Sequence, residues 1–142
     1  MPVLTDELKR VPLFSSLSRR QLKRLAHDFR EREFRPGTAV VQQGQMSGIG
    51  FFVIAEGTAS VAVDGAEVAR LGPGDHFGEL ALISESARTA TVTAEDRLRC
   101  LEITFWDFRR FAQANPDVSW KLLRHVGDLL SEQRGRTTLS PG

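Results

Sequence analysis

The chain has 142 residues, one cysteine and nearly balanced charge, with 19 Lys and Arg against 18 Asp and Glu. This length suits one domain, and 41% hydrophobic with 26% charged residues is typical of a globular protein, which excludes a disordered or fibrous chain. The sequence pI near 8.0 lies below the values above about 9 that are typical of nucleic-acid-binding domains, so we expect no direct nucleic-acid binding. The longest apolar run, Phe51 to Ala55, is far shorter than the roughly 20 residues that span a bilayer. With no signal-peptide pattern and a lone Cys100, we expect a cytoplasmic protein without a membrane span.

The N-terminal part, residues 5–30, is predicted to form helices. Ser18 and Gln21 have the spacing of a capping box, in which each side chain bonds the other residue's backbone N–H. After this cap, apolar residues recur at the spacing of one helix face: Leu22, Leu25, Ala26 and Phe29. We therefore expect an amphipathic helix that packs on a larger body.

Residues 31–103 are predicted to form many short strands. Apolar and β-branched runs alternate here with regularly spaced glycines, the pattern of a sandwich, roll or barrel. Asp64-Gly65 lies between two such runs and predicts a two-residue hairpin turn, in which both central residues need positive φ.

Residues 104–135 are predicted to form two helices. Thr104 and Asp107 mark the start of the first, and Asn115-Pro116-Asp117 supplies a cap, a proline at the first position and an acid in the first turn of the second. We expect the second helix to end near Arg134, before Gly135, and residues 136–142 to be a flexible tail. The sequence thus predicts one domain, residues 1–135, with a mainly β fold: a β roll with N-terminal helices and two C-terminal helices.

The segment with the clearest chemistry runs from Phe77-Gly78-Glu79-Leu80-Ala81-Leu82 to Ala87-Arg88-Thr89-Ala90-Thr91-Val92. Gly78 lets the backbone approach a ligand, and a helical turn after it would present free N–H groups to an anion. Arg88 has a fork of donors that suits two phosphate oxygens, with the Thr89 hydroxyl and the Ala90 N–H as further donors. These residue types predict a phosphate site.

Glu79 would repel a phosphate unless it accepts a hydrogen bond from a hydroxyl such as a ribose 2′-OH. Phosphate and ribose together indicate a nucleotide. The alternative is a structural ion pair between Glu79 and Arg88 with no ligand.

The same segment resembles the phosphate-binding cassette of cyclic nucleotide-binding domains, which occur in catabolite activator proteins, cyclic-nucleotide-dependent kinase subunits and cyclic-nucleotide-gated channels. The similarity extends to Phe34-Arg35-Pro36-Gly37, Gln43-Gly44, Phe52–Gly57 and Leu71–Asp75, and covers roughly residues 10 to 134. It implies a jelly-roll-like β roll. It also implies that Glu79 takes the ribose hydroxyl and Arg88 the cyclic phosphate. The binding residues that we carry over are Phe77, Gly78, Glu79, Leu80, Ala81, Arg88, Thr89 and Ala90.

The resemblance further implies a regulatory sensor that binds its ligand without converting it, so we expect no catalysis and no cofactor. We favour cAMP over cGMP as the ligand. The last helix would close over the base and transmit the signal, with Leu123, Arg124 and Gly127 as candidate base contacts. That helix also offers a seam for a homodimer. We expect the effector to be another chain or the rest of a longer protein.

Two other classes remain open at this stage. One is an interaction or scaffolding domain of the same fold without a ligand, and the other is a cupin-like metal enzyme. Gly72-Pro73-Gly74-Asp75-His76 resembles half a cupin motif, but His27 and His125 have no second ligand at metal-binding spacing, so we expect no metal. We interpret Cys100 as a small core residue, and Phe105, Trp106, Phe108 and Phe111 as helix core.

Overall fold

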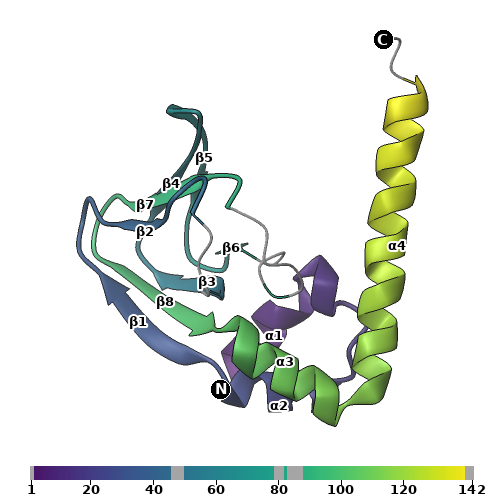
Figure 1. The fold of residues 1–142 in the computed structure, drawn as a ribbon. Coiled ribbons are helices and arrows are strands. Elements are labelled where there is room, and N and C mark those ends of the chain that lie inside the picture. Colours follow the sequence, from purple (N-terminus) through teal and green to yellow (C-terminus); the bar gives the residue numbers. More distant parts are fainter. Residues whose placement is uncertain (1, 46–49, 79–81, 83–87, 140–142) are drawn as a thin grey trace.

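The computed structural model describes residues 2–45, 50–78, 82 and 88–139, and consists of a β roll flanked by helices at both ends (Figure 1). The helices are α1 (Pro2–Lys9), the 3-10 turn η1 (Pro12–Phe14), α2 (Arg19–His27), α3 (Phe105–Ala114) and α4 (Pro116–Leu139). The strands are β1 (Arg30–Phe34), β2 (Ala39–Val41), β3 (Phe51–Glu56), β4 (Ala59–Val63), β5 (Ala66–Leu71), β6 (His76–Phe77), β7 (Thr91–Ala94) and β8 (Leu98–Ile103). The predicted fold class is confirmed.

The strands form two antiparallel four-stranded sheets, in the orders β1-β8-β3-β6 and β2-β7-β4-β5. Strand β3 is buried on both faces, because Phe51 and Val53 pack against the helices while Phe52 and Ile54 face the interior of the roll. The molecule therefore has two apolar clusters, one between the first sheet and the helices and one between the two sheets.

Three local signals of the sequence are found where they were predicted. Ser18 and Gln21 form the capping box of α2, with the Gln21 N–H donating to Ser18 Oγ at 3.1 Å and the Ser18 N–H to Gln21 Oε1 at 2.9 Å. Asp64 and Gly65 connect β4 to β5 with φ values of +53° and +83°, as a primed hairpin turn requires. The Asp107 N–H donates to Thr104 Oγ1 at 3.1 Å at the start of α3.

The C-terminal helices correct two expectations and add a contact at Asn115. Helix α4 does not end before Gly135 but continues to Leu139, because a glycine costs about 1 kcal/mol in a helix and does not terminate it. The Asn115 side-chain amide donates to the Phe111 carbonyl at 2.9 Å, so this side chain binds the end of α3. Trp106 is 57% exposed and lies outside the core, whereas Phe108 and Phe111 are buried as expected.

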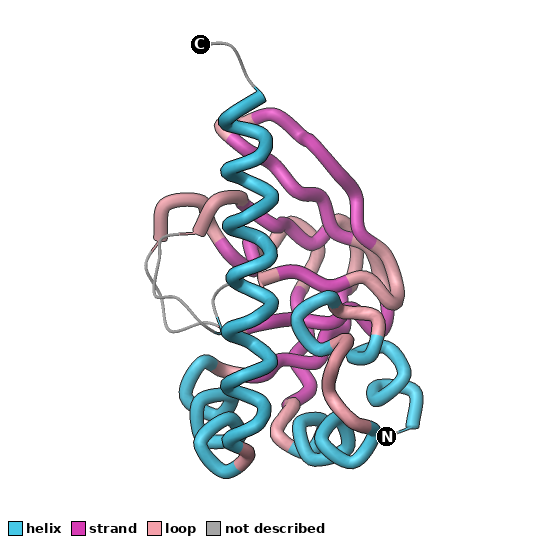
Figure 2. Tube along the Cα trace, turned by 90° about the vertical axis from the view of Figure 1, so that its right-hand side faces the viewer, coloured by secondary structure: helices cyan, strands magenta, loops and turns pink. Residues whose placement is uncertain are grey.

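Among the residues whose side chains the structure describes, those of α4 that pack on the body lie in its first turns. Val118 and Leu122 are buried against the helical cluster, whereas Trp120 and Leu123 are 63% and 62% exposed. The remainder of α4 stands apart from the β roll in Figure 1, and Figure 2 shows it as one continuous helix seen from the side. The position of α4 thus depends on a short contact with α3 and the N-terminal helices.

Candidate functional site

Gly78 follows β6 in a conformation and an environment that only glycine fits. Its φ is +86°, in the left-handed region, and an added Cβ would lie 2.9 Å from Arg88 Nη1 and 2.9 Å from the Gly50 carbonyl oxygen. The absence of a side chain at Gly78 therefore makes room for the Arg88 guanidinium.

Arg88 is held at both its backbone and its side chain. Its N–H donates to the Gln45 carbonyl at 3.0 Å, and its carbonyl accepts from the Gly44 N–H at 2.8 Å. Its Nη2 donates to the Gly50 carbonyl at 2.9 Å. Gly50, Gly78 and Arg88, which come from three separate segments, form what we call the arginine cradle.

The Arg88 guanidinium is half-buried. Burial lowers the pKa of Arg88, and the negative charge of Glu102 acts in the opposite direction. The group still remains protonated, because the ordinary pKa of arginine lies far above neutrality. A partly desolvated cation with forked donors is suited to an anion with paired oxygens, such as a phosphate.

Phe77 positions the cradle. Its ring stacks on Phe52, with the centroids 5.0 Å apart and the planes at 13°, and the two residues are paired in register between β6 and β3. This packing fixes the strand from which Gly78 follows.

Thr89 and Ala90 come directly after Arg88, with Thr89 exposed and Ala90 half-buried. The next residue, Thr91, accepts a hydrogen bond from the Gln43 N–H at its Oγ1, at 2.9 Å. Residues 43–45 therefore support the whole segment from Arg88 to Thr91. The sequence pattern does not predict the roles of Gln45 and Gly50, and the signal nearest to them is the Gln43-Gly44 pair.

Several predicted site residues cannot be placed in this geometry. Glu79, Leu80 and Ala81 lie outside the described residues, so their roles stay predictions. Leu123 and Arg124 are exposed on α4, and in the described part of the chain no atom outside the backbone of α4 lies within 4 Å of where a Gly127 Cβ would be. The base contacts assigned to these three residues also stay predictions.

The other chemically notable residue is Cys100, which is fully buried in the interior of the roll. Burial raises the pKa of this thiol to about 12, so it is a core residue rather than a reactive group, as predicted. In the described part of the chain, no three His, Cys, Asp or Glu side chains gather in a way that could hold a metal ion. Nor does any helix there have the length and apolarity needed to cross a membrane.

Comparison with known proteins gives the family. The model of the cyclic nucleotide-binding domain family matches residues 31–115, more than half of the chain. The chain belongs to this family, which confirms the resemblance seen in the sequence.

Individual relatives agree with this assignment. The cAMP-dependent protein kinase regulatory subunit of Yarrowia lipolytica is 37% identical over 105 residues, which cover 72% of this chain and 28% of that protein. The corresponding subunit of Schizosaccharomyces pombe is 41% identical over 93 residues, covering 65% and 22%. This chain thus spans only about a quarter of the length of these relatives.

A solved structure matches nearly the whole chain. The N-terminal domain of a transcriptional regulator from Streptomyces coelicolor superposes with a TM-score of 0.80 and 30% identity, covering 96% of this chain and 98% of that one. The similarity therefore includes the flanking helices as well as the β roll.

Proposed function

We propose that this chain is a regulatory sensor that binds a cyclic mononucleotide without converting it, and that it takes cAMP in preference to cGMP. The observation that carries the proposal is the arginine cradle. A half-buried guanidinium, fixed through Gly50 and given room by Gly78, offers forked donors to an anion. The family and the names of the two kinase regulatory subunits support a cyclic nucleotide as that anion and favour cAMP.

Within this proposal the residues have separate roles. Arg88 binds the cyclic phosphate, the backbone N–H groups of Gly78, Leu80 and Ala90 complete the phosphate site, and Glu79 accepts the ribose 2′-OH. A carboxylate next to a phosphate is tolerated only when it is bonded to such a donor.

Signal transmission is assigned to α4. Among the described side chains of α4, Val118 and Leu122 are the buried apolar ones and Leu123 is exposed, so α4 can move toward the roll with the loss of a small contact. Closure would bring Leu123, Arg124 and Gly127 to the base. The exposed face of α4 also provides a surface for an effector protein or for a second copy.

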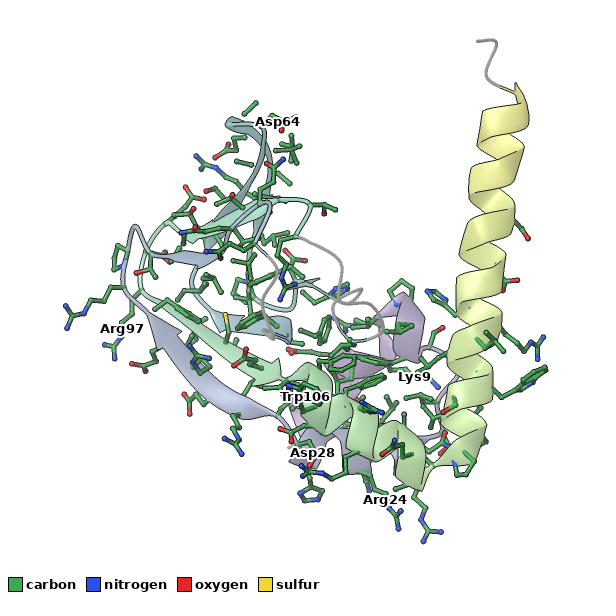
Figure 3. The ribbon with its side chains drawn as sticks, viewed as in Figure 1. Lys9, Arg24, Asp28, Asp64, Arg97 and Trp106 are labelled. Atoms are coloured by element: carbon green, nitrogen blue, oxygen red, sulfur yellow. The ribbon has the colours of Figure 1, made fainter. Side chains whose placement is uncertain are left out.

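Calorimetric titration of the chain with cAMP and cGMP tests the proposal. We expect Arg88→Ala to weaken binding by about 10- to 150-fold, the worth of a charge-assisted hydrogen bond. Arg88→Lys should bind poorly as well, because an ammonium group replaces a planar fork. The matched control is Arg97→Ala, which removes one positive charge from an exposed arginine paired with Glu33, at the periphery of the roll (Figure 3). Equal affinities of Arg88→Ala and Arg97→Ala, with both variants folded, would refute the role of Arg88.

The role of Glu79 is tested by changing the ligand as well as the protein. A 2′-deoxy cyclic nucleotide should bind the wild type markedly less well than its ribose counterpart, and Glu79→Gln should reduce this difference. If the wild type binds the two ligands equally, Glu79 does not contact the ribose.

A further inference from the structure

Strand β8 contains a buried acid that the proposed binding roles do not use. Glu102 is 8% exposed, and its Oε1 lies 2.6 Å from Arg32 Nη1 on β1. Arg32 is about half exposed, and its guanidinium lies 5.2 Å from the centroid of the Phe34 ring. An ion pair with one buried partner is only weak support for stability, because desolvation offsets the attraction. We therefore consider what else the pair does.

The position of Glu102 connects it to the arginine cradle. Glu102 is paired in register with Phe52, two residues after Gly50, and a side chain on Gly50 would overlap the carbonyl oxygen of Ile103, the next residue on β8. Gly50 in turn accepts the hydrogen bond from Arg88 Nη2. The charge of Glu102 also acts on Arg88, where it opposes the effect of burial on the pKa.

The charges of Glu102 and Arg32 affect how Arg88 binds an anionic ligand. The negative charge of Glu102 acts on Arg88, so without its partner this carboxylate would repel an incoming phosphate and attract the same guanidinium. Arg32 supplies the compensating positive charge, since it is bonded directly to the same carboxylate. Arg88, Arg32 and Glu102 together have one net positive charge, which favours the binding of an anion.

We propose that Arg32 is a positioning residue for ligand binding: by pairing with Glu102, it keeps that carboxylate from competing with the cyclic phosphate for Arg88. This inference rests on the proposed function and assigns two residues to it that do not contact the nucleotide. It predicts that the effect of losing Arg32 depends on the presence of Glu102.

A double-mutant cycle measured by cAMP titration tests this dependence. Arg32→Gln should weaken binding about tenfold. Glu102→Gln should not weaken it, and the double variant should return to within about twofold of the wild type. Arg32→Lys should retain affinity because it keeps the charge, and Arg97→Gln controls for a change in net charge. An Arg32→Gln variant that binds like Arg97→Gln, or a double variant as weak as Arg32→Gln, would overturn the inference.

A measurement on the free protein separates this inference from the proposed function. Nitrogen NMR of the arginine side chains should show slower rotation of the Arg88 guanidinium in Arg32→Gln, as Glu102 turns to it, and wild-type behaviour in the double variant. An unchanged Arg88 signal in Arg32→Gln would contradict the inference even if cAMP binds. Failure of the wild type to bind cAMP or cGMP would instead refute the proposed function.

Discussion

Gly78→Ala is the substitution that most directly tests the geometry of the arginine cradle. The new Cβ would lie 2.9 Å from Arg88 Nη1 and 2.9 Å from the Gly50 carbonyl oxygen. The guanidinium is the end of a flexible side chain and can move, but the Gly50 carbonyl belongs to the backbone and can shift only together with the start of β3. We therefore expect Arg88 to be displaced from the position in which it donates to Gly50.

Two costs add up in this variant. An L-residue in the left-handed region costs about 1–2 kcal/mol, and overpacking against fixed atoms costs typically another 1–3 kcal/mol. We expect the free energy of unfolding to fall by about 2–5 kcal/mol. Cyclic nucleotide affinity should fall as well, by up to the 10- to 150-fold expected for the loss of Arg88.

Gly65→Ala is the matched control. Gly65 has nearly the same φ, +83°, but apart from its two chain neighbours no described residue has an atom within 4 Å of where its Cβ would be. It occupies the tip of the β4–β5 hairpin beside Asp64 (Figure 3). Chemical denaturation and calorimetric titration of both variants separate the effect of the steric contact at Gly78 from the effect of the left-handed backbone conformation. If Gly78→Ala is no less stable than Gly65→Ala and binds the nucleotide equally well, the cradle does not need an empty position at Gly78.

Three further outcomes are expected. If the Thr89 hydroxyl bonds the guanine amine as well as the phosphate, Thr89→Ala should reduce the binding free energy of cGMP by about 0.5–1.5 kcal/mol more than that of cAMP. Equal losses for the two nucleotides in parallel titrations would limit Thr89 to a phosphate contact. Because the pKa of Cys100 is raised to about 12 in the folded state, its contribution to stability is complete below the ordinary thiol value and is lost as the pH rises toward 12. Denaturation between pH 8 and 10.5 should show this decline in the wild type and not in Cys100→Ala. Burial, and secondly the charge of Asp107, raises the pKa of Asp28. The ionised carboxylate therefore destabilises the folded state, and Asp28→Asn should be more stable than the wild type at pH 7. This difference in stability should disappear below about pH 3.8, where Asp28 is protonated. An Asp28→Asn variant that melts at or below the wild-type temperature at pH 7 would contradict this reasoning.

The features that depend on neighbouring residues could be predicted from the amino-acid sequence. The Ser18–Gln21 capping box, the Asp64-Gly65 turn and the Thr104 cap each depend on residues within three positions of one another, and each is present. The alternation of short apolar runs and glycines determined the β class, and the segment around Gly78 and Arg88 identified the family, which the comparisons confirm.

The residues that bond Arg88 or act on its charge are brought to it by the fold and could not be predicted from the sequence. Gln45 and Gly50 lie about 40 positions earlier in the chain, and Glu102 comes from another strand, so no spacing in the sequence relates them to the arginine. The exposure of Trp106 was also decided at this level, because a helix pattern shows which residues are apolar but not what faces them. The position of α4 follows the same principle: its direction depends on the packing of Val118 and Leu122 against distant helices, since a helix determines its own length and periodicity but not where it points.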